Sequence, residues 1–400
     1  MNVHSKEPFW LLKNGLMNPY PSLRKPLTCE VLVVGGGITG ALMAYHLVQA
    51  GFDTVVIDKR NVATGSTAAS TAMLQYEIDT ALHDLIPMIG EEGAVRAYRS
   101  CLEAIGKIDR LVKTVKSRSG FRKKKSLYVA ARPDDEDFLR QEYETRRQHG
   151  FRVEWFNRPS LSKRFGLAAN AAICSSDAAE IDAYHFAHDL LQAAAEKGVK
   201  IFDHVEIQST DYDPNGVRVL TTDLAQIDAR HVVYCTGYES QEMLPNKVVN
   251  LKSTFAIVSE PIPELPAALR TMLLWDTQKP YLYLRTTDDN RILVGGGDEP
   301  FKNAVLRDQL IDKKQEMLTE QVRELYPDLP FIPDLAWAGT FGETKDGLPY
   351  IGEHPDFPHS YFALGFGGNG ITFSVTAAEL IRDRLQGKPA DELHWYRFGR

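Results

Sequence analysis

The segment covering residues 29–58 constrains the fold of this chain more than any other, because it predicts a complete βαβ unit. Four apolar residues, 31–34, have the composition of a buried strand, and the next six, 35–40 (GGGITG), fit the pattern G-x-G-x-x-G. A helix is predicted over residues 39–50 and a second strand over residues 54–57. This order of elements is typical of an α/β fold with a Rossmann-like, doubly wound sheet.

Three glycines and one acid give this unit the pattern of a dinucleotide site. Gly35 permits the tight turn, Gly37 lets the backbone approach a pyrophosphate, and Gly40 lets the helix pack closely on the strand. Asp58 ends the second strand, where its carboxylate can accept hydrogen bonds from an adenosine ribose. The free amides at the helix N-terminus would bind the phosphates. The alternative is an incidental glycine-rich turn, and the pattern alone does not separate NAD from FAD.

Composition and charge narrow the class of protein. A chain of 400 residues with 44% apolar content can bury the core of one large domain or two intergrown ones. The net charge of −7 argues against nucleic acid as a partner, and the basic run 113–125 is expected to be a solvated helix end and loop. No apolar segment approaches the ~20 residues that span a bilayer, and residues 1–26 lack a signal-peptide pattern. We therefore expect a cytoplasmic protein.

The four cysteines lie far apart and form no Cys-x-x-Cys pair, so we expect neither a disulfide framework nor a metal site.

Ten small residues in succession occupy positions 63–72, among them Ser66, Thr67 and Ala72. One interpretation of this run is a flexible loop. The other is a segment lying against a bulky cofactor, because small side chains and hydroxyls let the backbone approach it. In that case Met73-Leu74-Gln75-Tyr76 would emerge near the reactive ring.

The middle of the chain interrupts the nucleotide pattern and then resumes it. Predicted elements of the interruption are a helix over 91–116, a strand over 127–130 and a surface helix over 134–149, which suggests an inserted domain. The nucleotide pattern resumes at 181–182, and its predicted elements are a helix over 185–197 and strands over 199–202, 217–220 and 231–234. The last of these strands ends at Cys235-Thr236-Gly237, where the main chain could pass near a pyrophosphate.

The second half of the chain predicts antiparallel strands and then a second glycine-rich turn. The strands cover 253–259, 281–286 and 291–294, and Gly295-Gly296-Gly297 is expected to be a turn that ends the last of them. A helix is predicted over 303–325. A strand over 361–364, a glycine turn over 365–370 and a helix over 371–385 follow. The N-terminus of this last helix could face a flavin pyrimidine edge and stabilise negative charge on the reduced ring.

These features together resemble the FAD-dependent D-amino-acid oxidase, glycine oxidase and sarcosine oxidase family. The resemblance extends from about Pro8 to the C-terminus, and its most specific parts are Gly35 to Gly40 with Asp58, the small-residue segment to Met73, the strand ending at Gly237, DGLPYIG at 346–352, and 365–372. It implies a Rossmann-like FAD domain and an inserted α+β substrate domain built on an antiparallel sheet. The FAD domain would comprise residues 1–85, 176–245 and 336–400, and the substrate domain residues 86–175 and 246–335.

The motifs and the resemblance together assign the cofactor contacts. In relatives, the position matching Ile207 contacts the adenine half of FAD, and those matching Ala72-Met73 and 368–372 lie around the isoalloxazine. The expected FAD-binding residues are Gly35, Gly37, Ile38, Thr39, Gly40, Asp58, Lys59, Arg60, Ser66, Thr67, Ala72, Met73, Ile207, Cys235, Thr236, Gly237, Gly342, Gly365, Gly367, Gly368, Asn369, Gly370, Ile371 and Thr372.

Departures from the family pattern bear on the substrate. Sarcosine-oxidase-like members attach flavin through a cysteine, whereas residues 337–344 contain none and the matching position is Gly339, so the FAD should be non-covalent. Thr372 stands where those members carry a carboxylate-binding lysine, and Phe341 where D-amino-acid oxidases often have an arginine. An amine, an N-alkylated compound or a substrate held otherwise therefore fits better than a simple α-amino acid. Arg285 either replaces the lost cation or is a solvated arginine on a sheet surface.

The resemblance implies hydride transfer from a C–H beside nitrogen to flavin N5, leaving an imine that water hydrolyses. Dioxygen or another acceptor would reoxidise the flavin, and no acid–base residue is identified. One alternative is a hydroxy-acid or polyol-phosphate dehydrogenase of the same superfamily. Another is a flavin-binding assembly protein without turnover. The candidate residues of the substrate pocket are Leu74, Gln75, Tyr76, Arg285 and Phe341.

Overall fold

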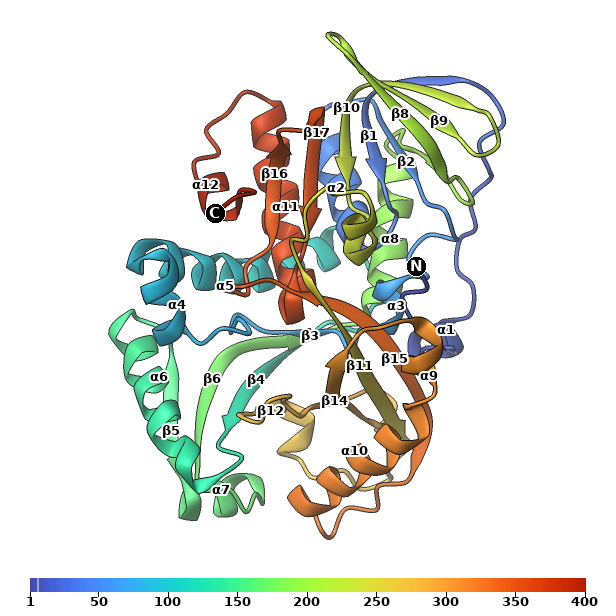
Figure 1. Ribbon diagram of the computed structural model, residues 1–400. Helices are drawn as coiled ribbons and strands as arrows, with labels where there is room; N and C mark the ends of the chain where they lie inside the picture. The colour runs from blue at the N-terminus through green and yellow to red at the C-terminus, as the bar shows by residue number, and fades with distance from the viewer. Residues whose placement is uncertain (6) are drawn as a thin grey trace.

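Two β-sheets organise the chain, which the computed structural model describes over residues 1–5 and 7–400. One sheet has eight strands and the other nine, and Figure 1 shows them in the upper and lower halves of the molecule. The predicted fold class, α/β with a Rossmann-like sheet and a second, largely antiparallel sheet, is confirmed.

The first sheet carries the predicted βαβ unit. Across the sheet the strands are β16 (Tyr350–His354), β17 (Phe357–Leu364), β10 (Gln226–Tyr234), β1 (Leu27–Val34), β2 (Thr54–Ile57) and β7 (Lys200–Phe202), with β9 (Gly216–Thr221) and β8 (Ile207–Asp213) attached to β10. Strands β17, β10, β1, β2 and β7 run parallel. The last four residues of β1 and all four of β2 are buried, as in strands covered on both faces. The turn that follows β1 therefore lies at the carboxyl edge of a buried sheet.

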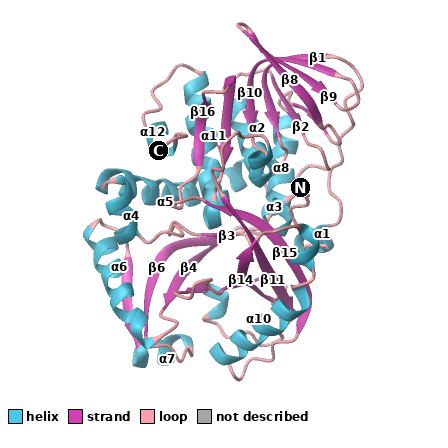
Figure 2. Ribbon diagram, viewed as in Figure 1, coloured by secondary structure: helices cyan, strands magenta, loops and turns pink. Residues whose placement is uncertain are grey.

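Helices pack beside this sheet and confirm the predicted ones within a few residues. Helix α2 (Ile38–Gln49) contacts both α8 (Ala183–Ala195) and α11 (Gly370–Leu385), which Figure 2 shows together in the upper half. Helix α5 (Glu91–Thr114) packs on α11, and its apolar face joins the core of the first sheet. The first sheet and its helices thus surround α2, and the N-terminus of α2 lies at the glycine turn that follows β1.

The second sheet is largely antiparallel. Its order is β15 (Pro333–Glu343), β11 (Asn250–Ser259), β14 (Ile292–Pro300), β13 (Tyr283–Thr286), β12 (Met272–Asp276), β4 (Arg122–Val129), β6 (Ala171–Glu180) and β3 (Met73–Leu74), with β5 (Val153–Asn157) paired to β6. Side chains alternate between its faces: Phe255 and Ile257 join a core with α10 (Ile311–Leu325), whereas Ala256 points to the opposite side. That opposite face is turned toward the first sheet and forms part of a cavity.

One prediction for this sheet is wrong. Gly295-Gly296-Gly297 does not end a strand, because β14 continues through these residues to Pro300 and pairs with β11. Gly295 lies opposite Tyr283, and a Cβ there would overlap the tyrosine ring. Gly297 has φ +67, beside a shift of register in β11. The glycines make room for an aromatic side chain and a bulge, rather than for a turn.

The basic run 113–125 is also only partly solvated. Lys113 and Lys123 have 73% and 74% of their side chains exposed, but Lys124 is buried on β4, with its Nζ 3.1 Å from the Glu180 carboxylate. The prediction of a solvated helix end and loop is therefore wrong over residues 122–125, which belong to β4, and Lys124 is buried there.

The other helices are short or peripheral. They are α1 (Phe9–Asn14), α3 (Ser66–Ala69), α4 (Leu82–Ile89), α6 (Glu136–Gln148), α7 (Arg158–Phe165), α9 (Ala304–Asp308) and α12 (Leu393–Tyr396), with 3-10 turns at Pro133–Asp135, Gly237–Glu242, Leu269–Thr271 and Gly367–Asn369. Across residues 1–5 and 7–400, none of the helices has both the length and the apolar character needed to span a bilayer.

Candidate active site

A cavity of about 650 Å³ lies between the two sheets. Its lining runs from the carboxyl ends of β1, β2 and β10 to the inner face of β11, β13, β14 and β15. This volume is within the range of cavities that enclose cofactors and small ligands. The position, at the carboxyl ends of parallel strands, is where doubly wound folds bind nucleotides.

The glycine turn between β1 and α2 forms the first wall of the cavity. Gly35 has φ +103, and a Cβ there would lie 2.5 Å from the carbonyl oxygen of Cys235. A Cβ at Gly40 would overlap the carbonyl oxygen of Gly35, so helix and turn are in direct backbone contact. Gly37 caps α2 without any side-chain hydrogen bond, and Gly37, Ile38 and Thr39 line the cavity. The helix N-terminus therefore presents its backbone to an anionic group.

Asp58 occupies the end of β2, as predicted, and lines the cavity. Its carboxylate accepts hydrogen bonds from the backbone N–H groups of Gly36, at 2.8 Å, and Arg60, at 2.9 Å. Burial raises the pKa of Asp58, and the two N–H donors oppose that rise. A carboxylate has about four acceptor sites, so capacity remains for the hydroxyls of a ribose.

Glu239, which was not singled out from the sequence, forms ion pairs with the two basic residues beside Asp58. Its Oε1 lies 2.9 Å from Lys59 Nζ and 2.8 Å from Arg60 Nη2. Lys59, Arg60, Glu239 and Ile207 all line the cavity at this end. Only the folded chain brings Glu239 here, since it follows β10 and lies far from Asp58 in sequence.

The small-residue run forms one long side of the cavity. Residues 65–67 and 69–73 are in the lining, with the short helix α3 in their middle. Two buried indoles hold the segment: Trp337 Nε1 donates to the carbonyl of Ala69 at 2.9 Å, and Trp10 Nε1 to that of Ser70 at 2.7 Å. The Thr67 hydroxyl accepts from the N–H of Ile38 at 2.9 Å. The run is therefore fixed at both ends of α3, which a flexible loop would not be.

The second glycine-rich turn closes the opposite side. Gly367, Gly368, Gly370 and Ile371 line the cavity. Asn369, in contrast, donates its side-chain amide to the carbonyls of Gln75, at 3.1 Å, and Glu77, at 2.8 Å.

Several predicted cofactor residues near this turn lie behind the lining. The Thr372 hydroxyl is buried and donates to the carbonyl of Asn369 at 3.0 Å. Gly342 and Gly365 leave room for Tyr238, Val249 and Thr344. The cavity lining therefore lacks four of the predicted residues near this turn, namely Asn369, Thr372, Gly342 and Gly365.

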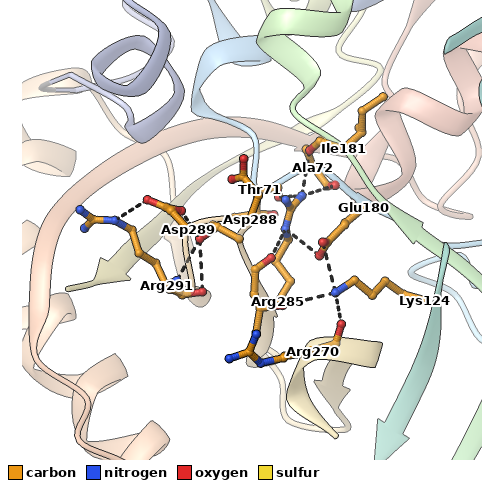
Figure 3. A network of polar contacts seen from close by, with 12 residues as sticks. Thr71, Ala72, Lys124, Glu180, Ile181, Arg270, Arg285, Asp288, Asp289 and Arg291 are labelled. Carbon is orange, nitrogen blue, oxygen red and sulfur yellow. Dashed lines mark hydrogen bonds and ion pairs between the residues drawn. The ribbon is translucent and has the colours of Figure 1, made fainter. Parts of the chain in front are cut away.

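Arg285, considered above as a substitute for the missing substrate cation, is directed elsewhere (Figure 3). Its Nη1 donates to the carbonyls of Thr71, Ala72 and Ile181 at 3.0, 2.8 and 2.9 Å. Its Nε lies 3.5 Å from Glu180, which also pairs with Lys124. The side chain is buried and outside the cavity lining. Arg285 therefore holds the backbone of the cofactor segment, where Ala72 has φ +54, and is not available to a substrate carboxylate.

Because side chains alternate between the two faces of a strand, the predicted residues at 73–76 fall into two groups, one facing the cavity and one facing the core. Met73 and Gln75 line the cavity, whereas Leu74 and Tyr76 point into the core, where Tyr76 stacks on Phe151 with ring centroids 5.1 Å apart. Phe341 lines the cavity as expected. Leu74 and Tyr76 were thus placed on the wrong face of their segment, because a two-residue periodicity cannot be assigned in so short a strand.

The inner face of the second sheet adds residues that the sequence did not reveal. Tyr281, Tyr283 and Asp298 line the cavity together with Thr254 and Phe341. We call this end of the cavity the chamber. Over the part of the chain that the structure describes, the only lysine or arginine side chains in the whole lining are Lys59 and Arg60, at the Asp58 end. Burial raises the pKa of Asp298 to about 6, and the charge of Asp79 adds to the rise.

Comparisons with known proteins agree with this geometry. The family model described as "FAD dependent oxidoreductase" (DAO) matches residues 30–384. A glycine oxidase of Geobacillus kaustophilus is 26% identical over 377 residues, which cover 90% of this chain and 93% of the relative. A gamma-glutamylputrescine oxidoreductase of Escherichia coli K12 is 24% identical over 383 residues, covering 92% and 86%.

A solved structure has the same fold. The crystal structure of glycine oxidase from Geobacillus kaustophilus superposes with a TM-score of 0.79 at 22% identity, and the match covers 91% of this chain and 96% of the other. The residues present fit an FAD: the N-terminus of α2, whose cap residue Gly37 has no side chain, suits the pyrophosphate, Asp58 suits a ribose, and the cavity continues beyond them to the chamber.

Proposed function

This chain belongs to the DAO family of FAD-dependent oxidoreductases, and we propose that it oxidises a C–N bond of a small amine or amino-acid-like compound. FAD, when bound, supplies the acceptor for a hydride at flavin N5. The hydride leaves the carbon beside the substrate nitrogen, and water then hydrolyses the resulting imine. Dioxygen or another acceptor and a cytoplasmic location are part of the same proposal.

The observation that carries this proposal is the composition of the chamber. Its walls are the aromatic side chains of Tyr281, Tyr283 and Phe341 and the carboxylate of Asp298, with no basic side chain in the lining around them among the described residues. Carboxylates and phosphates of substrates are normally held by arginine or lysine. Hydroxy acids, polyol phosphates and simple α-amino acids would therefore meet an unfavourable site, whereas an amine would not.

The chain's own residues position the reactants. The N-terminus of α2 and Asp58 would hold the pyrophosphate and ribose, and Lys59 and Arg60 both pair with Glu239. Gly370 and Ile371 bring the N-terminus of α11 to the cavity, where its dipole would stabilise negative charge. The names of the similar proteins cover both an amino-acid oxidase and an amine oxidoreductase, so the chamber is what favours the amine here.

Anaerobic reduction of the purified yellow protein tests the proposal. We expect amines to bleach the flavin absorbance, whereas hydroxy acids and polyol phosphates leave it unchanged. Bleaching by hydroxy acids alone would favour a dehydrogenase of the same superfamily. A flavin that no compound of either panel reduces, but that dithionite reduces normally, would favour an assembly protein without turnover.

A further inference from the structure

We propose that the chamber binds a second, permanently protonated amino group of the substrate, so that the substrate is a diamine or polyamine. This inference rests on the proposed amine oxidation and specifies its substrate class. Three features carry it: a carboxylate inside the chamber with one unpartnered oxygen, a second carboxylate at the edge of the chamber, and the aromatic rings in the same lining.

Asp298 is the carboxylate inside the chamber. It follows the three glycines of β14, and its Oδ1 is buried without a hydrogen-bond partner among the residues that the structure describes. A buried carboxylate oxygen that lacks a donor is costly, and a ligand that donates a hydrogen bond removes that cost. Because Asp298 lines the cavity, the missing donor can come from a bound molecule.

Asp79 is the second carboxylate. It accepts hydrogen bonds from the N–H of Gly368, at 2.8 Å, and from the Tyr281 hydroxyl, at 3.2 Å, and both donors line the cavity. A Cβ on Gly367 or Gly368 would lie 2.5 or 2.7 Å from its oxygens, so the glycine turn is shaped to admit this acid. Asp79 therefore lies at the edge of the chamber, close enough to Asp298 for its charge to raise the pKa of that residue.

Neither acid has an ion-pair partner within 4 Å among the described residues. The positive charge of Lys252 lowers the pKa of Asp298, but the Lys252 Nζ is paired with Glu343 at 3.3 Å. Glu343 itself adds negative charge near both acids. The chamber is therefore anionic overall, and a cation is the ligand that would neutralise it.

The aromatic rings favour an ammonium group over a metal ion. Tyr281 and Tyr283 are two residues apart and both line the cavity, with ring centroids 5.6 Å apart, and Trp275 lies edge-on to Tyr281 at 6.2 Å. Ammonium groups bind aromatic faces as well as carboxylates. The described residues contain no cluster of three metal-ligating side chains, which a resident metal ion would need.

The cation held in the chamber must differ from the nitrogen that reacts. Carboxylates stabilise the protonated form of an amine, whereas hydride transfer requires a neutral nitrogen with a free lone pair. A monoamine held between Asp79 and Asp298 would keep its proton and react slowly. A substrate with two amino groups can bind through one and react at the other.

The test compares matched substrates on the FAD-loaded enzyme. We expect kcat/KM for straight-chain diamines of three to five carbons to exceed that of monoamines of equal length by at least tenfold, and 4-aminobutanoate to be the poorest of the set. In Asp298→Asn and, separately, Asp79→Asn, the ratio of diamine to monoamine should fall toward one. The control, Asp223→Asn, removes an exposed carboxylate in the turn between β9 and β10 and should leave the ratio unchanged.

Two results distinguish this inference from the proposed function. Amines that reduce the flavin with no preference for the diamine, or with a preference that survives both substitutions, would overturn the diamine proposal alone. No reduction by any amine would overturn both proposals. Flavin absorbance of each variant checks that its cofactor site has formed.

Discussion

At the scale of single residues, Arg285 shows how a buried cation can serve the backbone rather than a ligand. Its guanidinium donates hydrogen bonds to three backbone carbonyls, two at Thr71-Ala72 and one at Ile181. These bonds fix the backbone at Ala72, which has a positive φ. Without the guanidinium, the Ala72 carbonyl would keep only the backbone N–H of Ile181 as a donor, and the carbonyls of Thr71 and Ile181 would lose the side-chain donor that they have. Arg285, which the sequence suggested as a substrate ligand, therefore shapes the wall of the cofactor cavity instead.

Replacing Arg285 by methionine should lower the free energy of unfolding by about 3 kcal/mol, because it breaks a buried ion pair and removes the side-chain donor from the carbonyls of Thr71, Ala72 and Ile181. FAD affinity should fall as well, and lysine at this position should restore only part of both. Thermal denaturation and titration of the apoprotein with FAD measure the two effects. Arg218→Met, which removes an exposed arginine paired with Asp228, should change neither.

Asp298 should give catalysis a pH dependence. Its pKa is raised to about 6, so its carboxylate is charged above that pH and neutral below it, and only the charged form attracts a cation. For a diamine, kcat/KM should rise as the pH increases through about 6, in addition to any rise from deprotonation of the reacting amine.

The groups that face Asp298 set this behaviour: Asp79, Glu343 and Lys252 by charge, and Thr254 and Tyr283 beside it. The pH profile of kcat/KM reports the free enzyme. In Asp298→Asn the rise of kcat/KM near pH 6 should disappear. A rise that persists in this variant would assign the titration to another group.

At the scale of elements, the contact between α2 and β1 is the most restrictive feature of the fold. Gly40→Ala should destabilise the protein by about 1–3 kcal/mol, because the new Cβ would overlap the carbonyl oxygen of Gly35 and push the helix from the turn. Most of the bound FAD should be lost, as judged from the ratio of flavin to protein absorbance. Gly106→Ala is a matched control within α5, where the nearest atom to a Cβ is 3.8 Å away, and its flavin content should be unchanged.

Elements could be predicted from the sequence where neighbouring residues in the chain determine them, and could not where contacts with distant segments do. The βαβ unit, α5 and α11 follow from apolar periodicity and glycine positions within one segment, and the structure confirms them. The path of β14 through Gly295 could not be predicted, since it depends on the ring of Tyr283 on a neighbouring strand.

The candidate site divides in the same way. The glycine turn and Asp58 belong to a motif with fixed spacing and lie where expected. The burial of Arg285 depends on Thr71 and Ile181, which only the folded chain brings together, and the chamber acids Asp79 and Asp298 come from different segments. No local pattern could have paired them.

At the scale of the whole molecule, the lining of the cavity bears on how the flavin is attached. Cys235 is the one cysteine in the lining over the described chain, and burial raises the pKa of its thiol well above the ordinary value. A thiol that stays protonated is a poor nucleophile toward a flavin ring. Precipitation with acid should therefore release all of the FAD into the supernatant, and yellow colour retained in the pellet would contradict non-covalent binding.

The wall of the cavity also has a consequence for biosynthesis. It draws on Val3 near one end of the sequence and Ile371 near the other, with the indoles of Trp10 and Trp337 holding its middle. A ribosome releases these segments in order, so a nascent chain that lacks α11 has only part of the enclosure. Capture of the vitamin-derived cofactor is consequently a late event, and until it happens the newly made protein keeps an open interior that depends on cellular flavin supply.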